Sequence, residues 1–342
     1  RAKILFMKKQ MMMLLAIAAM AGCSKSEVVD TPNGDGNTPI KLKTFVGKSV
    51  KATETKTDNL TAFQMTAYTT SAAFPGTAST DEPTPFIASQ LVSRTGESSP
   101  YSWPYTGPQY WPQGKKVSFF AYAPATDVTY VAPTGAGWPG FTYTVAAEAS
   151  QADLVVAQRT SQDATSNNGS VALNFNHALS QILFSAKCAN ADFTAVVKTI
   201  ELSGIQNAGT YTYATSASEG TAIEGAWSSV SGTASYAYLT NGTAAIAKTT
   251  SDPIAGTNGA LMLMPQALTG AKLKVVYSVT LGTGETAQTF DVTKENVELK
   301  GTWAPGMKYT YDLTLVSDAK QITLDPSVKP WTEGTITDQP SL

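Results

Sequence analysis

Apolar residues recur at every second position in many short runs along the chain. Val, Thr, Tyr and Phe fill these runs, whereas Gly, Pro, Asn and Asp fill the gaps between them. Period two points alternate side chains to opposite faces, which predicts β-strands with one buried face, and the gap residues are typical of hairpin turns. The clearest runs are residues 42–46, 63–67, 117–121, 141–145, 171–175, 273–279 and 309–315.

The same pattern extends over nearly the whole chain, so the fold class is predicted to be all-β. Only residues 190–197 carry a spacing that also fits a helix. The polar, turn-rich stretch 160–170 is the clearest break between strand-like runs. We therefore expect two β-sandwich domains in tandem, residues 40–165 and residues 166–342.

The N-terminus has the three-part layout of an export signal. Lys8 and Lys9 precede an apolar run at residues 11–20, and small residues follow it. A run of about ten residues is too short to cross a bilayer, which takes about 20 residues of helix. We therefore expect residues 1–22 to be removed, with residues 1–6 lying upstream of a start at Met7.

The end of the signal, Met20-Ala21-Gly22-Cys23, resembles the bacterial lipobox, although the usual first residue is Leu. This resemblance implies that Cys23 is lipidated, that the chain is cut before it, and that the precursor is anchored in the outer membrane. The turn-rich residues 23–39 then predict a flexible tether.

Loss of the signal changes the charge balance. Residues 1–22 hold four of the 24 basic residues and none of the 26 acidic ones, so a net charge of −6 remains. No basic cluster is left, which disfavours nucleic-acid binding. With Cys23 lipidated, Cys188 is the one remaining thiol, so no disulfide within the chain is expected.

Motifs for catalysis or cofactor binding are weak. The glycines at Gly135, Gly137 and Gly140 fit a dinucleotide pattern, but a strand-like run follows them, which indicates a turn. Residues 317–320 fit S-x-x-K between two strand-like runs, which indicates a hairpin loop. The one histidine, His177, could pair only with Cys188 as a dyad, and we interpret it as structural. We predict no enzyme, no cofactor and no metal site.

Tryptophans are the remaining candidates for ligand contact, because aromatic faces stack on sugars and also anchor sandwich cores. Trp103 and Trp111 each lie beside a proline in a stretch predicted to be a loop. These two residues keep a glycan-binding site open as an alternative.

Several strand-like runs, taken in order, resemble the fimbrillin family of lipoprotein pilins. The resemblance covers nearly all of the chain after the lipobox. The runs begin at Tyr110-Trp111-Pro112 and include residues 117–124, 151–157, 171–182, 261–266 and 303–311, with a late Trp331.

The resemblance implies two transthyretin-like β-sandwich domains and a pilus subunit of the strand-exchange type, often called type V. In that family an Arg- or Lys-specific protease removes the first strand, and a strand from a neighbouring subunit fills the groove. Here residues 40–51 match the removable first strand. Lys51 best matches the cut position, followed by Lys56 and Lys48, because no arginine lies between Cys23 and Arg94. Residues 321–342 are a candidate donor segment, or else an ordinary closing hairpin.

The expected function is therefore a structural subunit of a cell-surface fimbria, with other pilin subunits and a processing protease as partners. The expected mature form lies in the fimbrium and contributes to adhesion. A tip or accessory adhesin that binds a host or bacterial surface is one alternative. A glycan-binding surface lipoprotein is the other.

Overall fold

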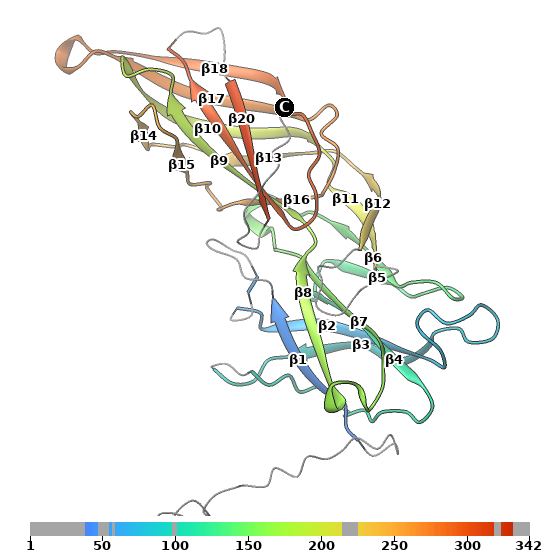
Figure 1. Cartoon of the computed structure of the whole chain (residues 1–342). Coiled ribbons are helices and arrows are strands. Elements are labelled where there is room, and N and C mark those ends of the chain that lie inside the picture. Colours follow the sequence, from blue (N-terminus) through green and yellow to red (C-terminus); the bar gives the residue numbers. More distant parts are fainter. Residues whose placement is uncertain are drawn as a thin grey trace, which may run out of the picture.

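The computed structural model describes residues 38–46, 55–56, 59–97, 101–213, 225–317 and 323–330. Within these ranges the regular structure is twenty β-strands with three short 3₁₀ turns and no α-helix (Figure 1). The all-β prediction is confirmed. No helix in the described ranges is long and apolar enough to span a membrane.

A six-stranded sheet forms the lower part of the molecule in Figure 1. Its two edges are β1 and β3, and β1 runs parallel to its neighbour β8, whereas the other pairs are antiparallel. In sheet order the strands are β1 (Lys41–Val46), β8 (Ser170–His177), β7 (Val155–Gln162), β4 (Lys116–Ala123), β2 (Ala62–Thr70) and β3 (Thr84–Ser93).

Strand β4 is buried along almost its whole length because apolar residues cover both faces of this sheet. Phe119 and Ala121 point into a core made only of residues from Ile40 to Phe175. Phe120 and Tyr122 point to the other side, into a larger core that includes residues up to Leu315. A strand buried on both faces can carry apolar residues at consecutive positions, as β4 does at residues 119–123.

A four-stranded sheet connects the two halves of the chain. Strand β6 pairs antiparallel with β11, so residues 140–144 lie beside residues 208–212. A side chain at Gly140 would collide with the carbonyl of Tyr211, so this close approach requires glycine. The strands in sheet order are β12 (Ala226–Ser231), β11 (Ala208–Thr212), β6 (Gly140–Thr144) and β5 (Val128–Val131).

Two further sheets enclose the larger core in the upper part of Figure 1. One contains β13 (Ala234–Leu239), β10 (Phe193–Ile205), β17 (Lys272–Leu281) and β18 (Gln288–Glu298), with β14 (Ala245–Ile246) beside β10. The other contains β15 (Asp252–Ile254), β9 (Ser180–Cys188), β19 (Met307–Leu315) and β20 (Thr323–Pro330), with β16 (Leu261–Leu263) beside β9.

Two details of the structure differ from what the sequence pattern predicts. The helix considered at residues 190–197 is wrong, because β10 begins at Phe193 and buries Phe193, Ala195 and Val197 on one face. Strand β8 lies in the first sheet, beyond the expected domain boundary after residue 165, and the chain leaves that sheet between His177 and Ser180. The division into two domains stays a prediction.

Candidate functional site

Strand β1 forms one edge of the first sheet and has a polar and an apolar face. Leu42, Thr44 and Val46 are buried, and Ile40 just before the strand is 3% exposed. Between them lie exposed side chains, of which Phe45 is 55% exposed. Six consecutive residues of β1 pair with residues 170–175 of β8, and no other strand of the described ranges pairs with β1.

The segment before β1 is held by the loop that precedes β4. The N–H of Trp111 donates to the carbonyl of Thr38 at 3.1 Å, and the N–H of Ile40 donates to the carbonyl of Gln109 at 2.9 Å. The hydroxyl of Tyr105 also donates to the carbonyl of Ile40 at 3.2 Å. These bonds fix the position at which β1 begins to pair with β8.

A groove of about 570 Å³ runs between β1 and the segment at residues 101–108. Its walls combine the strand with aromatic and proline residues. The residues that line it from that segment are Tyr101, Ser102, Trp103, Pro104, Tyr105 and Pro108. An edge strand beside an apolar groove offers unpaired backbone groups and pockets for side chains, which is the geometry that β-augmentation uses.

The segment after β1 is fastened at Thr55. Its backbone N–H donates to Oδ2 of Asp153 at 2.7 Å, and its hydroxyl donates to the carbonyl of Asp153 at 3.3 Å. Asp153 also forms a buried pair with His177, whose Nδ1 lies 2.8 Å from Oδ2. The connection from β1 to β2 is therefore held near its end by a buried carboxylate.

The expected processing residues differ in where they lie. Cys23, Lys48 and Lys51 are outside the described residues. Lys56 lies in a turn just before β2, where its carbonyl accepts from the N–H groups of Asn59 and Leu60 and its own N–H donates to the side chain of Asn59. The backbone of Lys56 is therefore already engaged within the protein, which makes Lys56 a weaker candidate for the cut.

Both candidate sugar-binding tryptophans are in the core. Trp103 is 4% exposed and its ring lies 5.3 Å from that of Phe63, and Trp111 is 1% exposed with its ring 6.1 Å from that of Phe119. The indole N–H of Trp111 donates to the carbonyl of Gly169 at 3.2 Å. The low exposure of both rings argues against sugar stacking, although Trp103 lines the groove beside β1.

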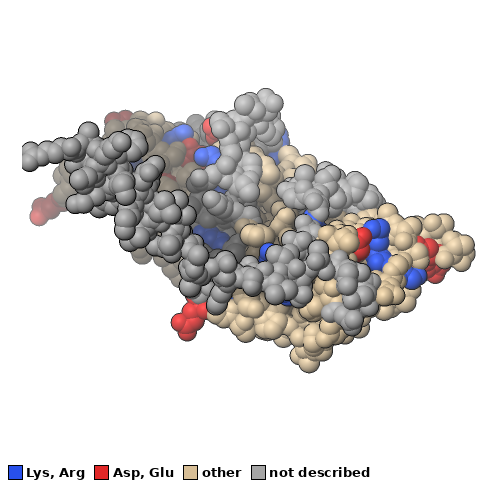
Figure 2. Space-filling model, turned by 60° about the horizontal axis from the view of Figure 1, so that its bottom comes forward, with Lys and Arg blue, Asp and Glu red and all other residues tan. Residues whose placement is uncertain are grey.

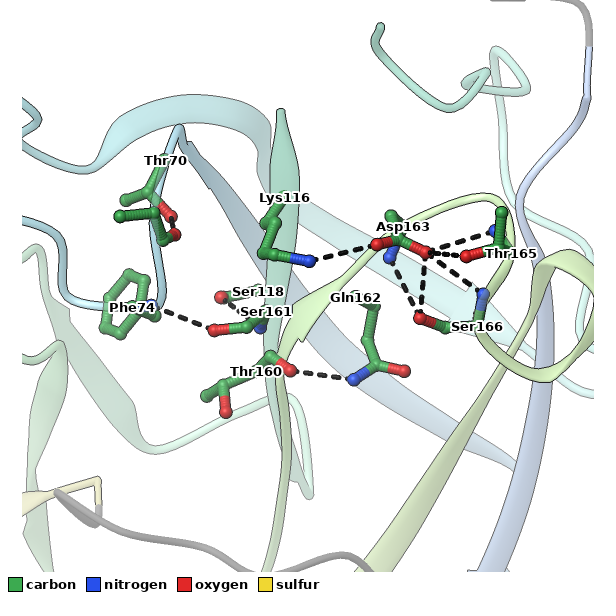
Figure 3. Close-up of polar contacts among 11 residues, drawn as sticks. Thr70, Phe74, Lys116, Ser118, Thr160, Ser161, Gln162, Asp163, Thr165 and Ser166 are labelled. Atoms are coloured by element: carbon green, nitrogen blue, oxygen red, sulfur yellow. Dashed lines mark hydrogen bonds and ion pairs between the residues drawn. The ribbon is translucent and has the colours of Figure 1, made fainter. Parts of the chain in front are cut away.

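The turn between β7 and β8 leads directly into the strand that pairs with β1. Asp163 organises it: one carboxylate oxygen accepts from the N–H and hydroxyl groups of Thr165 and Ser166, and the other accepts from Lys116 at 2.9 Å (Figure 3). These bonds, above all that from the Thr165 hydroxyl and then that from Lys116, hold the pKa of Asp163 well below its usual range. The carboxylate therefore stabilises this turn in its charged form.

His177 and Cys188 do not form a dyad. His177 pairs with Asp153, whereas the thiol of Cys188 donates to the carbonyl of Ile246 at 3.2 Å. Burial raises the pKa of the Cys188 thiol, which disfavours the reactive thiolate. The structure supports the interpretation of His177 as a structural residue. Sequence reasoning missed Asp153 as its partner, and no spacing in the chain signals that pairing.

Basic side chains on the face seen in Figure 2 lie in small separate groups, and one of them lies between acidic side chains. The visible part of this face therefore has no continuous basic patch of the kind that binds nucleic acids. No group of three or more His, Cys, Asp or Glu side chains in the described ranges could hold a metal ion.

Comparison with known proteins gives a consistent family. The chain is 28% identical over 386 aligned positions to "Fimbrium subunit Fim1C" of Phocaeicola vulgatus, covering 96% of this chain and 98% of the relative. A crystal structure of a fimbrial protein from Bacteroides vulgatus shares the fold, with a TM-score of 0.66 and 23% identity, over 86% of this chain and all of the other. The Fimbrillin-like family model matches residues 50–331. The chain therefore belongs to the fimbrillin-like family, whose members are structural subunits of fimbriae and not enzymes.

Proposed function

We propose that this fimbrial subunit is exported as a lipoprotein and polymerises when a protease removes β1 and a strand of a neighbouring subunit takes its place. The supporting observation is the position of β1 at the edge of the first sheet, paired only with β8 in the described ranges and inserting alternate side chains into the core. Removal of such a strand exposes both a row of backbone groups and the pockets of its side chains. A strand of matching pattern satisfies both.

The proposed cut follows Lys51. Lys56 is a weaker candidate because its carbonyl is bonded within a turn. A cut after Lys51 gives a new N-terminus at Ala52, three residues before Thr55, whose two bonds to Asp153 hold the chain to the body of the protein. The segment leading to β2 therefore keeps its attachment when β1 is lost.

The proposed donor segment is residues 321–342 of a second copy. Within it, β20 pairs residue by residue with β19 at the edge of its sheet, so in the isolated chain it closes a hairpin. Its side chains Leu324, Pro326 and Val328 are only half-buried, unlike the fully buried residues of β19 such as Leu313. Exchange requires either that β20 leaves β19 or that residues after Pro330 supply the strand.

Brief treatment with trypsin tests this function. The purified chain without its signal should lose residues before Ala52, as read by N-terminal sequencing, and should then form SDS-resistant ladders on gels. Trypsin could also remove β1 by a cut after Lys48, so Lys48→Gln and Lys51→Gln are combined and together should prevent both changes. Lys56→Gln is the matched control that should leave them intact. A clean monomer after loss of β1 would contradict the proposal.

The anchoring step has a separate test. Cys23→Ala should abolish labelling of the precursor by radioactive palmitate in cells and release the protein from the outer-membrane fraction. Labelling that persists in this variant would show that Cys23 is not the lipidated residue.

A tip or accessory adhesin of the same fold is the second candidate, favoured by the lack of any arginine between Cys23 and Arg94. An Arg-specific protease would leave such a chain uncut and anchored. Immunogold electron microscopy separates the two: labelling along the fibre supports a stalk subunit, and labelling only at its end supports the adhesin.

A further inference from the structure

One inward-facing position of β1 is polar. In and just before β1, the side chains that point into the core beneath the first sheet are those of Ile40, Leu42, Thr44 and Val46. Thr44 is 7% exposed. Its hydroxyl oxygen is shut off from solvent and has no hydrogen-bond partner within the described ranges. A buried hydroxyl without a partner loses its bonds to water and gains none in return, so its position is unfavourable.

The residues next to Thr44 on the same face of the sheet are apolar. Its neighbour across the ladder is Leu173, which is fully buried, and the residues on either side of it on the same face are Leu42 and Val46. Buried hydroxyls elsewhere in the described ranges are bonded. Examples are Thr70, which donates to the carbonyl of Ala72 at 2.7 Å, and Ser180, which donates to the carbonyl of Ala304 at 2.9 Å.

We infer that Thr44 weakens the binding of β1 to β8 and to the core beneath it. A strand with an aliphatic side chain at this position would therefore bind more tightly and displace β1. The hold is already limited, because β1 pairs along one side only and in the parallel arrangement, which is slightly less stable per residue. Valine has nearly the shape of threonine and would fill the same space without the buried hydroxyl. The buried hydroxyl of Thr44 thus favours replacement of β1 by the entering strand over the reverse reaction.

The entering strand fits this position when it alternates and carries an aliphatic residue in the matching place. In the C-terminal segment, Leu324 and Val328 stand on one face of β20 and supply such side chains. This step rests on the proposed strand exchange between copies, whereas the weak hold of β1 concerns the uncut chain alone.

Hydrogen exchange in the uncut chain tests the hold directly. Amides of β1 should exchange about tenfold more slowly in Thr44→Val than in the wild type, which corresponds to about 1.4 kcal/mol. Thr44→Ser keeps the hydroxyl and should give no slowing. Thr129→Val, at an exposed position of β5, is the matched control and should leave β1 unchanged. Exchange in Thr44→Val as fast as in the wild type overturns the inference.

Ladder formation after trypsin tests the second part. If wild-type ladders form, they should form more slowly in Thr44→Val, and an equal rate in the two proteins overturns the role of Thr44 in exchange. If amide exchange slows but no variant forms ladders, the weak hold of β1 is supported and the proposed polymerisation fails.

Discussion

The backbone N–H of Thr55 donates a hydrogen bond of 2.7 Å to the carboxylate of Asp153, 98 positions further along the chain. The same carboxylate pairs with His177 at the end of β8. One buried side chain therefore ties together the segment after β1, the segment before β7 and the last residue of β8. In the proposed strand exchange these elements stay in place while β1 leaves.

Replacing Asp153 with alanine should destabilise the protein. The change removes the bond to Thr55 and leaves His177 without its carboxylate in a site where the histidine side chain is 5% exposed. Loss of one partner of a buried pair costs about 3 kcal/mol. Urea unfolding measures the effect. Asp192→Ala, at an exposed turn position, is the control and should change stability by less than about 0.5 kcal/mol. Equal effects of the two substitutions would show that the Asp153 contacts contribute nothing.

The turn at Asp163 predicts a dependence on pH. Because its folded-state pKa is depressed, the charged carboxylate stabilises the fold above the unfolded pKa of about 4, and this contribution is lost as pH falls towards the folded-state pKa. Asp163→Asn should therefore cost about 1 kcal/mol at pH 7, a modest value because solvent screens a side chain that is 35% exposed.

The measurement for Asp163 compares urea unfolding of the two proteins across pH. The difference between wild type and Asp163→Asn should shrink as pH falls below about 4, where the wild-type carboxylate begins to lose its advantage over the unfolded state. A difference that is constant from pH 7 to pH 3 would show that the charge of Asp163 is not its cause.

Local patterns predicted strands such as β2, β8 and β19 because the signal lies within each strand. In β8 the apolar residues Val171, Leu173 and Phe175 alternate with polar ones, and the structure buries those three on one face. In β10 the pattern was ambiguous, since Phe193, Ala195 and Val197 follow a turn whose residues also fit a helix. The pairing of β10 with β17 along ten residue pairs decides between the two, and that pairing is invisible in a local window.

Contacts between distant segments could not be predicted in the same way. Three examples are the bond from Thr55 to Asp153, the pairing of β6 with β11 and the burial of Trp103. They depend on how distant strands pair and how sheets pack, not on spacing along the chain. Trp103 illustrates the difficulty, because a tryptophan beside a proline in a loop fits both a sugar platform and a core anchor. The fold assigns it to the core, 5.3 Å from the ring of Phe63.

The two faces of β1 should respond differently to truncation. Leu42→Ala removes a side chain that is 8% exposed and should cost about 2 kcal/mol, at the lower end for core leucines because β1 is an edge strand. Phe45→Ala, three residues along the same strand, removes a ring that is 55% exposed and should cost much less. Urea unfolding of the uncut chain compares them. A larger loss in Phe45→Ala would mean that β1 presents the opposite face to the core.

The contact between the two halves gives the last prediction. The hydroxyl of Tyr213, just after β11, donates to the carbonyl of Ala121 in β4 at 2.9 Å, and its ring lies 5.0 Å from that of Phe120. Tyr213→Phe keeps the ring and removes only the bond, so it should cost about 1 kcal/mol. Because the bond joins the first sheet to the segment after β11, the whole unfolding transition should shift without splitting in two. Tyr110→Phe, at a ring 48% exposed, is the matched control and should have little effect. Calorimetry measures the transition. If it splits in Tyr213→Phe, this one bond couples the two halves. If it does not shift at all, the packed rings alone hold the halves together.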